Sequence, residues 1–193
     1  MKERLAVFMD RDGTINEEVG YLSKLEQLRL FPAVGEAIRQ INRSGMKAVV
    51  VTNQSGVARG FFDDAFVATV HARINDLLQQ SDAFIDRFYY CPHHPVYGSE
   101  KYKIACDCRK PKPGLLLRAA EEMDLDLSRS YMIGDMIKDI QAGHNAGVEK
   151  AILVKTGYGQ NVVHTDMPVY IAQDILDAVE WILNDRKQKT SSL

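Results

Sequence analysis

This chain of 193 residues has little cysteine, no long apolar run and almost no net charge, and each shortage excludes a class of protein. Its three cysteines are an odd number, and in a reducing compartment such a small cluster indicates metal ligation rather than disulfides. No apolar run approaches the roughly 20 residues that span a bilayer. A net charge of −2 without a basic stripe argues against nucleic acid as a partner.

The start of the chain leads directly into a strand-like run, which leaves no room for a secretory signal peptide. We therefore expect a cytoplasmic protein that binds neither membrane nor nucleic acid, and we expect it to be a monomer.

Short strand-like runs alternate with amphipathic helical segments along the chain. The expected strands are residues 4–9, 47–51, 85–90, 131–133 and 151–154, and the expected helices are residues 33–43, 63–80, 114–123, 137–145 and 174–183. This alternation predicts an α/β fold with a single Rossmann-like parallel sheet between helices. We expect one domain over residues 1–185, a minimal cap made of loops, and a disordered tail over residues 186–193.

Two carboxylates stand two residues apart where the first expected strand ends, in Asp10-Arg11-Asp12-Gly13-Thr14. Alternate residues of an extended chain point the same way, so Asp10 and Asp12 can face one pocket while Arg11 turns aside. One carboxylate can attack and hold a cation while its neighbour moves protons, which suits phosphoryl transfer. The alternative is an Asp-rich turn that closes a strand.

Polar residues also follow two other expected strands, with Thr52-Asn53 after one and Asp135 after another. Parallel sheets bind ligands beyond the carboxyl ends of their strands, so these residues and Asp10 should meet at one edge. Carboxylates so close together repel unless a cation lies between them, and oxygen ligands beside phosphate favour Mg²⁺. Asp139 is expected to orient neighbours or cap a helix rather than bind metal.

Three thiolates and one imidazole lie in two short clips, and together they form a recognised closed tetrahedral zinc set: Cys91, His93, Cys106 and Cys108. We expect a structural Zn²⁺ that staples this loop, with free buried thiols as the alternative and His94 as a competing ligand. The loop would deliver Arg109 and Lys110, which can neutralise a phosphate oxygen. The alternative for this basic pair is a solvated turn.

Taken in order, Asp-x-Asp-Gly-Thr at residues 10–14, a threonine at a strand end, a lysine before a helix and Gly-Asp-x-x-x-Asp at residues 134–139 resemble the haloacid dehalogenase-like phosphatases. The resemblance spans residues 5–147, and the Cys and His clips narrow it to the branch related to histidinol phosphatases. It implies a phosphoric monoester hydrolase that acts on a small sugar phosphate with Mg²⁺. Asp10 would be the nucleophile that forms an aspartyl-phosphate, and Asp12 the general acid and base.

The resemblance also assigns the other site residues. It implies Mg²⁺ bound by Asp10, Asp135 and the backbone carbonyl of Asp12. It implies that Thr52 and Lys110, assisted by Arg109, hold the phosphoryl group. The residues in sugar-contacting positions are Glu18, Val19, Gly20, Tyr21, Asn53, Gln54 and Ser55. Met136 departs from the pattern, because related enzymes tend to carry a basic residue there that touches substrate, and Lys138 is the residue that would compensate.

Three other functions are weighed against this one. A histidinol-phosphate phosphatase would share the fold and mechanism. A binding module that senses phosphorylated metabolites without turnover would not need the proton-handling carboxylate of the Asp10 and Asp12 pair. A nucleic-acid 3′-phosphatase is disfavoured by the acidic net charge.

Overall fold

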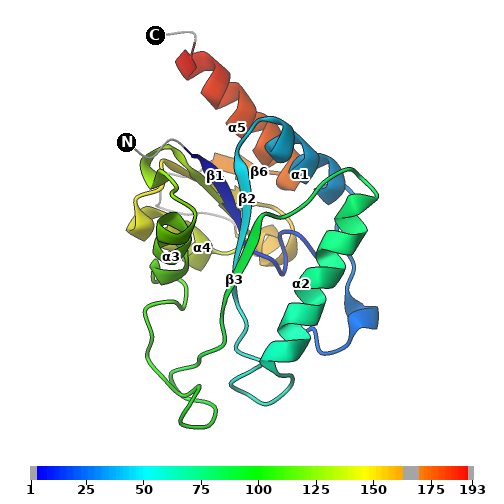
Figure 1. Cartoon of the computed structure of the whole chain (residues 1–193), viewed down its shortest axis with the longest axis vertical. Coiled ribbons are helices and arrows are strands. Elements are labelled where there is room, and N and C mark those ends of the chain that lie inside the picture. Colours follow the sequence, from blue (N-terminus) through cyan, green and yellow to red (C-terminus); the bar gives the residue numbers. More distant parts are fainter. Residues whose placement is uncertain (1–3, 163–169, 191–193) are drawn as a thin grey trace.

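A computed structural model of the chain describes residues 4–162 and 170–190, in which all strands lie parallel in one sheet (Figure 1). The strands are β1 (Ala6–Met9), β2 (Lys47–Asn53), β3 (Arg87–Cys91), β4 (Tyr131–Gly134), β5 (Lys150–Val154) and β6 (Tyr170–Ala172), and their spatial order is β3-β2-β1-β4-β5-β6. The predicted α/β fold with a single parallel sheet is confirmed. Sequence patterning missed β6 because three residues at a sheet edge are too few to show a period.

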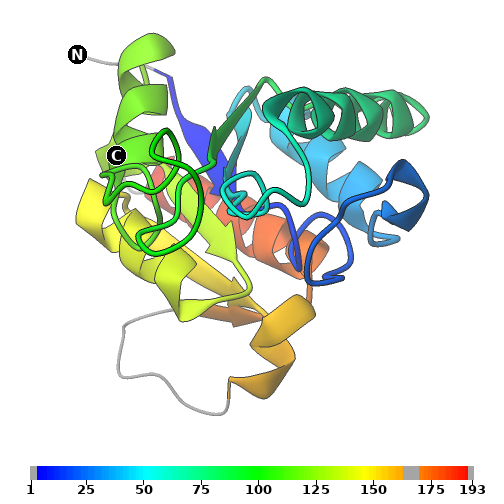
Figure 2. The ribbon, with the colours of Figure 1, turned by 90° about the horizontal axis from the view of Figure 1, so that it is seen from below.

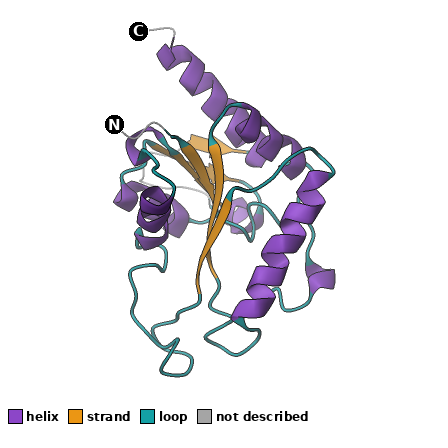
Figure 3. Cartoon of the chain, viewed as in Figure 1, coloured by secondary structure: helices purple, strands orange, loops and turns teal. Residues whose placement is uncertain are grey.

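Helices cover both faces of this sheet (Figure 3). They are α1 (Val34–Arg43), α2 (Asp64–Gln79), α3 (Gly114–Glu122), α4 (Ile137–Ala146) and α5 (Ile175–Thr190). The buried residues of β1 alternate between the two layers, with Val7 and Met9 packed beside α1, α2 and α5. Ala6 and Phe8 point the other way and pack beside α3 and α4. Burial on both sides explains why the strands read as continuous apolar runs.

The carboxyl ends of the parallel strands share one edge of the sheet, and the long loops gather there. The loops after β2 and β3 extend from the lower end of the sheet in Figure 1, and Figure 2 looks onto them from below. In the described part of the chain these loops, rather than a second domain, surround that edge, which agrees with the minimal cap that the sequence predicts.

The last helix is longer than predicted. α5 continues through residue 190, so the interpretation of residues 186–193 as a disordered tail is wrong for its first five residues, and residues 191–193 lie outside the described part. Contacts between this helix and distant strands hold the extra turns, and sequence periodicity does not report such contacts. None of the helices in the described residues is long and apolar enough to cross a membrane.

Asp185 anchors α5 to the sheet. It accepts hydrogen bonds from Lys150 Nζ at 2.6 Å and the Tyr131 hydroxyl at 2.9 Å, and it pairs with Lys189 at 2.9 Å. Burial alone would raise the pKa of Asp185, but these hydrogen bonds outweigh it and lower the pKa to about 2. The stabilisation that the charged Asp185 carboxylate gives to the fold is therefore complete above its unfolded pKa of about 4, and it is lost as the pH falls toward 2.

We expect Asp185→Asn to lower the free energy of unfolding by about 1–2 kcal/mol at pH 7, because it removes the charged acceptor. The gap to the wild type should shrink at pH 3, where the wild-type carboxylate begins to lose its advantage. Denaturant unfolding of both proteins at the two pH values checks this. An equal gap at pH 3 and pH 7 would contradict the ionic anchor.

Candidate active site

Three carboxylates converge at the sheet edge. Asp10 follows β1, Asp135 follows β4 and Asp139 belongs to the first turn of α4, and their ligand oxygens lie within 4.8 Å of one another. Lys110 is fully buried between two of them, with Nζ 2.8 Å from Asp10 Oδ1 and 2.7 Å from Asp139 Oδ1. One buried ammonium group thus faces three carboxylates. Burial, together with Asp10 and Asp139, raises the pKa of Asp135 to about 8.

The donor set around Asp135 fits a divalent cation. Its Oδ2 accepts the Tyr158 backbone N–H at 2.8 Å, whereas its buried Oδ1 has no hydrogen-bond partner among the described residues. An unpartnered carboxylate oxygen within a cluster of oxygen ligands is what Mg²⁺ requires. Gly13 permits the close approach, because at its φ of 83° an added Cβ would lie 2.1 Å from Asp135 Oδ2.

Asp139 performs both of the tasks expected of it. It accepts the Met136 backbone N–H at 3.0 Å, which caps α4, and its other oxygen pairs with Lys110. It therefore positions the lysine as well as the helix.

Asp12 lies in the same cavity but outside the carboxylate cluster. Oδ1 accepts from Arg11 Nε at 3.2 Å, Arg11 Nη2 at 3.0 Å and Asn16 Nδ2 at 2.9 Å, and Oδ2 accepts from Arg11 Nη2 at 2.9 Å and Gln54 Nε2 at 2.8 Å. Burial alone would raise the pKa of Asp12, but the Arg11 charge and these hydrogen bonds outweigh it and lower the pKa.

Arg11 does not turn aside as predicted, since its buried side chain folds back onto Asp12. Its guanidinium also donates to Gln54 Oε1 at 3.0 Å and lies 3.5 Å from His71 Nε2. His71 stacks on Phe88, and burial and the Arg11 charge lower its pKa to about 3, so the imidazole is neutral. The position of His71 on the apolar face of α2 was the one sequence signal for this support.

A cavity of about 250 Å³ opens over these groups. The predicted site residues that line it are Asp10, Asp12, Glu18, Gly20, Tyr21, Thr52, Asn53, Gln54, Ser55 and Arg109. Leu22, Gly56 and Phe62 also line it, from segments that the sequence suggests as walls, and Tyr158 is the lining residue outside every predicted segment. Met136 and Lys138 also line it. Val19 is not among the lining residues and is 41% exposed. Burial, with Asp12 and Asp10 nearby, raises the pKa of Glu18.

Gln54 and Asn53, two of the residues expected to contact the sugar, bind other residues of the site. Gln54 Nε2 donates to Thr52 Oγ1 at 2.9 Å as well as to Asp12, so this amide links Thr52 to Asp12. Asn53 clamps the backbone of Lys110, accepting its N–H at 3.0 Å and donating to its carbonyl at 3.1 Å. These two side chains hold other site residues in place.

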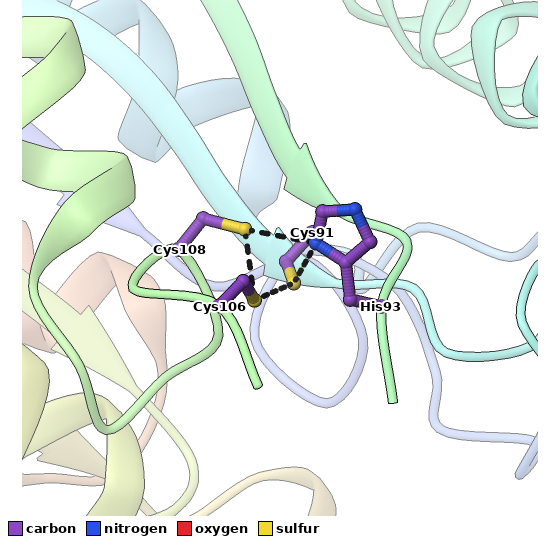
Figure 4. Close-up of side chains that lie close together, drawn as sticks. All are labelled: Cys91, His93, Cys106 and Cys108. Carbon is purple, nitrogen blue, oxygen red and sulfur yellow. Dashed lines mark hydrogen bonds between the residues drawn. The ribbon is translucent and has the colours of Figure 1, made fainter. Parts of the chain in front are cut away.

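The four Cys and His residues come together at the end of β3, as the sequence predicts (Figure 4). Cys106 Sγ is 3.5 Å from Cys91 Sγ and 3.2 Å from Cys108 Sγ, and His93 Nδ1 is 3.4 Å from Cys108 Sγ. Tetrahedral Zn²⁺ with bonds of about 2.0–2.3 Å places its ligands roughly 3.5 Å apart, so the set fits zinc. His94 is not part of the cluster, because its Nδ1 accepts the N–H groups of Val96 and Tyr97.

We expect Cys106→Ser to lower the zinc content and to reduce the melting temperature by about 5–10 °C, because a lost ligand opens the staple. Metal analysis and thermal melts measure both effects. A chelator should lower the wild-type melting temperature similarly, and added Zn²⁺ should restore the wild type but not the variant. Unchanged zinc content and melting temperature in Cys106→Ser would refute a structural zinc.

Comparisons with known proteins show the family to which the chain belongs. The family described as HAD-hydrolase-like matches residues 107–178. D-glycero-beta-D-manno-heptose-1,7-bisphosphate 7-phosphatase of Escherichia coli is 40% identical over 93% of this chain and 88% of its own length. D-glycero-D-manno-heptose-1,7-bisphosphate 7-phosphatase of Thermosynechococcus vestitus is 44% identical over 93% of this chain and 95% of its own.

A solved structure has the same fold. D,D-heptose 1,7-bisphosphate phosphatase from B. bronchiseptica, complexed with magnesium and phosphate, superposes with a TM-score of 0.85 at 30% identity, covering 95% of this chain and 99% of the other. The chain therefore belongs to the haloacid dehalogenase-like hydrolase family, as a phosphatase. Within that family its relatives are the heptose 1,7-bisphosphate phosphatases.

Proposed function

We propose that this chain removes the 7-phosphate of D-glycero-D-manno-heptose 1,7-bisphosphate and releases heptose 1-phosphate. The observation that carries this is the buried Asp10–Lys110 pair beside Asp135 at the floor of a small polar cavity, in a chain whose relatives bear that activity in their names. The product would feed synthesis of nucleotide-activated heptose for lipopolysaccharide. We further propose that the protein works in the cytoplasm as a monomer.

Asp10 is the nucleophile in this proposal. Its Oδ1 accepts the Arg11 backbone N–H at 2.8 Å and the Lys110 ammonium, which leaves Oδ2 as the attacking atom. Oδ2 forms a bond to phosphorus as the bond to the sugar oxygen breaks, giving an aspartyl-phosphate that water then hydrolyses. Bound Mg²⁺, held by Asp10 and Asp135, would offset repulsion between the anionic nucleophile and the anionic phosphoryl group.

Asp12 moves the protons. It gives one to the leaving sugar oxygen and takes one from the attacking water. All its acceptor sites face donors in the resting structure, so at least one contact with Arg11 or Gln54 must open before the carboxyl group can carry a proton. Thr52 Oγ1 accepts from Gln54, so its own hydrogen remains available for a phosphoryl oxygen.

The far end of the cavity suits the rest of the substrate. Arg109 and Lys138 are the cationic residues among those that line the cavity. We assign Arg109 to the transferred phosphoryl group, beside Thr52 and Lys110, and Lys138 to the distal phosphate. Glu18 and Tyr21 supply the wall that would meet sugar hydroxyl groups. Met136 weakens this recognition relative to a basic residue, which keeps histidinol phosphate, with its single phosphate, as the second candidate.

The test is phosphate release from both anomers of heptose 1,7-bisphosphate and from histidinol phosphate, each with Mg²⁺ or with a chelator. We expect a kcat/KM at least about 100-fold higher for one bisphosphate anomer, and loss of activity on chelation. Phosphorus NMR of the product should show that the 7-phosphate has gone. Preference for histidinol phosphate would overturn the substrate assignment. Absence of turnover on both bisphosphate anomers and on histidinol phosphate would overturn the proposal that the protein is an enzyme of this kind.

A further inference from the structure

Arg59 lies between aromatic rings from two different loops. It belongs to the turn after β2, and its guanidinium carbon is 3.8 Å from the centroid of the Tyr97 ring and 5.8 Å from that of the Tyr21 ring. The Arg59 Nε is buried and has no hydrogen-bond partner among the described residues. Its Nη2 lies 3.4 Å from His94 Nε2, so the two rings and one imidazole of the neighbouring loop together hold this guanidinium.

Tyr97 connects Arg59 to the loop that carries the Cys and His cluster. His93 is in the cluster, and the next residue, His94, accepts the Tyr97 backbone N–H at 3.2 Å and so shapes the turn that presents the ring. Gly98 packs directly on the turn after β2, because an added Cβ there would lie 2.7 Å from the carbonyl oxygen of Ala58. The contacts of Arg59 with Tyr97 and His94 and the packing of Gly98 on Ala58 thus join the metal-binding loop, residues 92–107, to the turn after β2.

Tyr21 connects Arg59 to the cavity. Tyr21 lines it, and its ring packs edge-on against Phe61 with centroids 4.7 Å apart. Both rings are partly in solvent, with Tyr21 39% and Phe61 53% exposed. A half-exposed ring with few neighbours is free to change rotamer unless something fixes it. Arg59 is the group that reaches both Tyr21 and the metal-binding loop.

We propose that Arg59 is a positioning residue that transmits the order of the metal-binding loop, residues 92–107, to Tyr21 and so sets the sugar-facing wall of the cavity. It does not line the cavity, and it acts through Tyr21 rather than on the reacting atoms. This role rests on the proposed function, because it takes Tyr21 as a contact for the substrate beyond the transferred phosphoryl group.

If Arg59 has this role, its replacement should change the kinetics for heptose 1,7-bisphosphate but not for a small phosphate compound without a sugar. We expect Arg59→Met to raise KM for heptose 1,7-bisphosphate about tenfold, the effect of losing a well-packed cation–π contact, with kcat changed less than about twofold. Acetyl phosphate lacks the sugar that Tyr21 would contact, so its kcat/KM should be unchanged. Arg59→Lys keeps the cation and should recover most of the KM.

A matched control is available on α3. The Arg118 guanidinium lies 5.7 Å from the Tyr89 ring, and Arg118 is not a cavity residue, so Arg118→Met makes the same chemical change and should leave KM for both substrates unchanged. Equal losses on both substrates in Arg59→Met, or an unchanged KM, would overturn the positioning role. If the wild type does not hydrolyse the bisphosphate, the proposed function fails, and the same comparison with its preferred sugar phosphate decides the role of Arg59.

A second measurement separates coupling from general loop damage. Tyr97→Leu removes the ring on the other side of Arg59 and should raise KM to a similar extent. If the two residues act as one unit, the Arg59→Met/Tyr97→Leu double variant should be no worse than either single variant. Multiplied effects in the double variant would show that the two residues act independently and would overturn the proposal.

Discussion

Asp10→Asn is expected to lower phosphate release by at least about a thousandfold while the protein stays folded, because an amide oxygen is a far weaker nucleophile than a carboxylate. The amide oxygen can still accept the Arg11 backbone N–H and the Lys110 ammonium, so the local hydrogen bonds survive. The change also removes one negative charge from beside Asp135. We therefore expect a melting temperature equal to or above that of the wild type. Steady-state kinetics and a thermal melt measure the two effects.

Asp185→Asn is the matched control for that experiment, since it makes the same substitution at a carboxylate that binds Lys150 on the far side of the fold from the cavity. It should lose stability and keep its activity, the reverse of Asp10→Asn. Activity retained in Asp10→Asn would remove Asp10 as the nucleophile. Equal activities in wild type and variant, both very slow, would favour the binding module instead.

The second large effect is expected at Lys110, whose side chain is 0% exposed. Burial alone would lower the pKa of Lys110, but Asp10 and Asp139 raise it, so the group stays charged. Lys110→Met leaves the buried carboxylates without their cation. We expect the free energy of unfolding to fall by about 3–5 kcal/mol at pH 7, because uncompensated buried charge is costly. We also expect kcat to fall at least about 100-fold, since the lysine no longer neutralises the phosphoryl group.

Lys112→Met tests the same change two residues along the same loop. Lys112 is half exposed and pairs with the solvent-exposed Asp107 at 2.9 Å, so its loss should change stability by less than about 1 kcal/mol. Denaturant unfolding and steady-state kinetics of the two variants give the comparison. Similar effects at positions 110 and 112 would contradict the buried ion-pair role and point to a general requirement for basic residues in this loop.

Much of the candidate site could be predicted from short patterns in the sequence. The strand before Asp10 and the strand before Thr52 are apolar runs that end in polar residues, and parallel strands bring such ends together whatever the rest of the chain does. The close spacing within each Cys and His clip likewise brought its members near one another. The structure accordingly placed Asp10, Asp135 and Lys110 in one cluster, and the four Cys and His residues in another.

Other features depended on contacts between distant segments. Arg11 folds back because Gln54, 43 residues away, and His71, 60 residues away, offer it buried partners. α5 keeps its last turns because Lys150 and Tyr131 bind Asp185. Asn53 and Gln54 turn inward for the same kind of reason, although their positions after β2 equally suited substrate contacts.

The sequence by itself determined the order of the helices and of the first five strands, the sheet edge at which Asp10 and Asp135 meet, and the four candidate zinc ligands. These follow from periodicity and spacing within a few residues, which the backbone translates directly into direction. Only the tertiary structure decided where the loop side chains point, namely Arg11 onto Asp12 and Arg59 between Tyr97 and Tyr21. A loop side chain has several rotamers of similar energy, and packing against distant segments selects one of them.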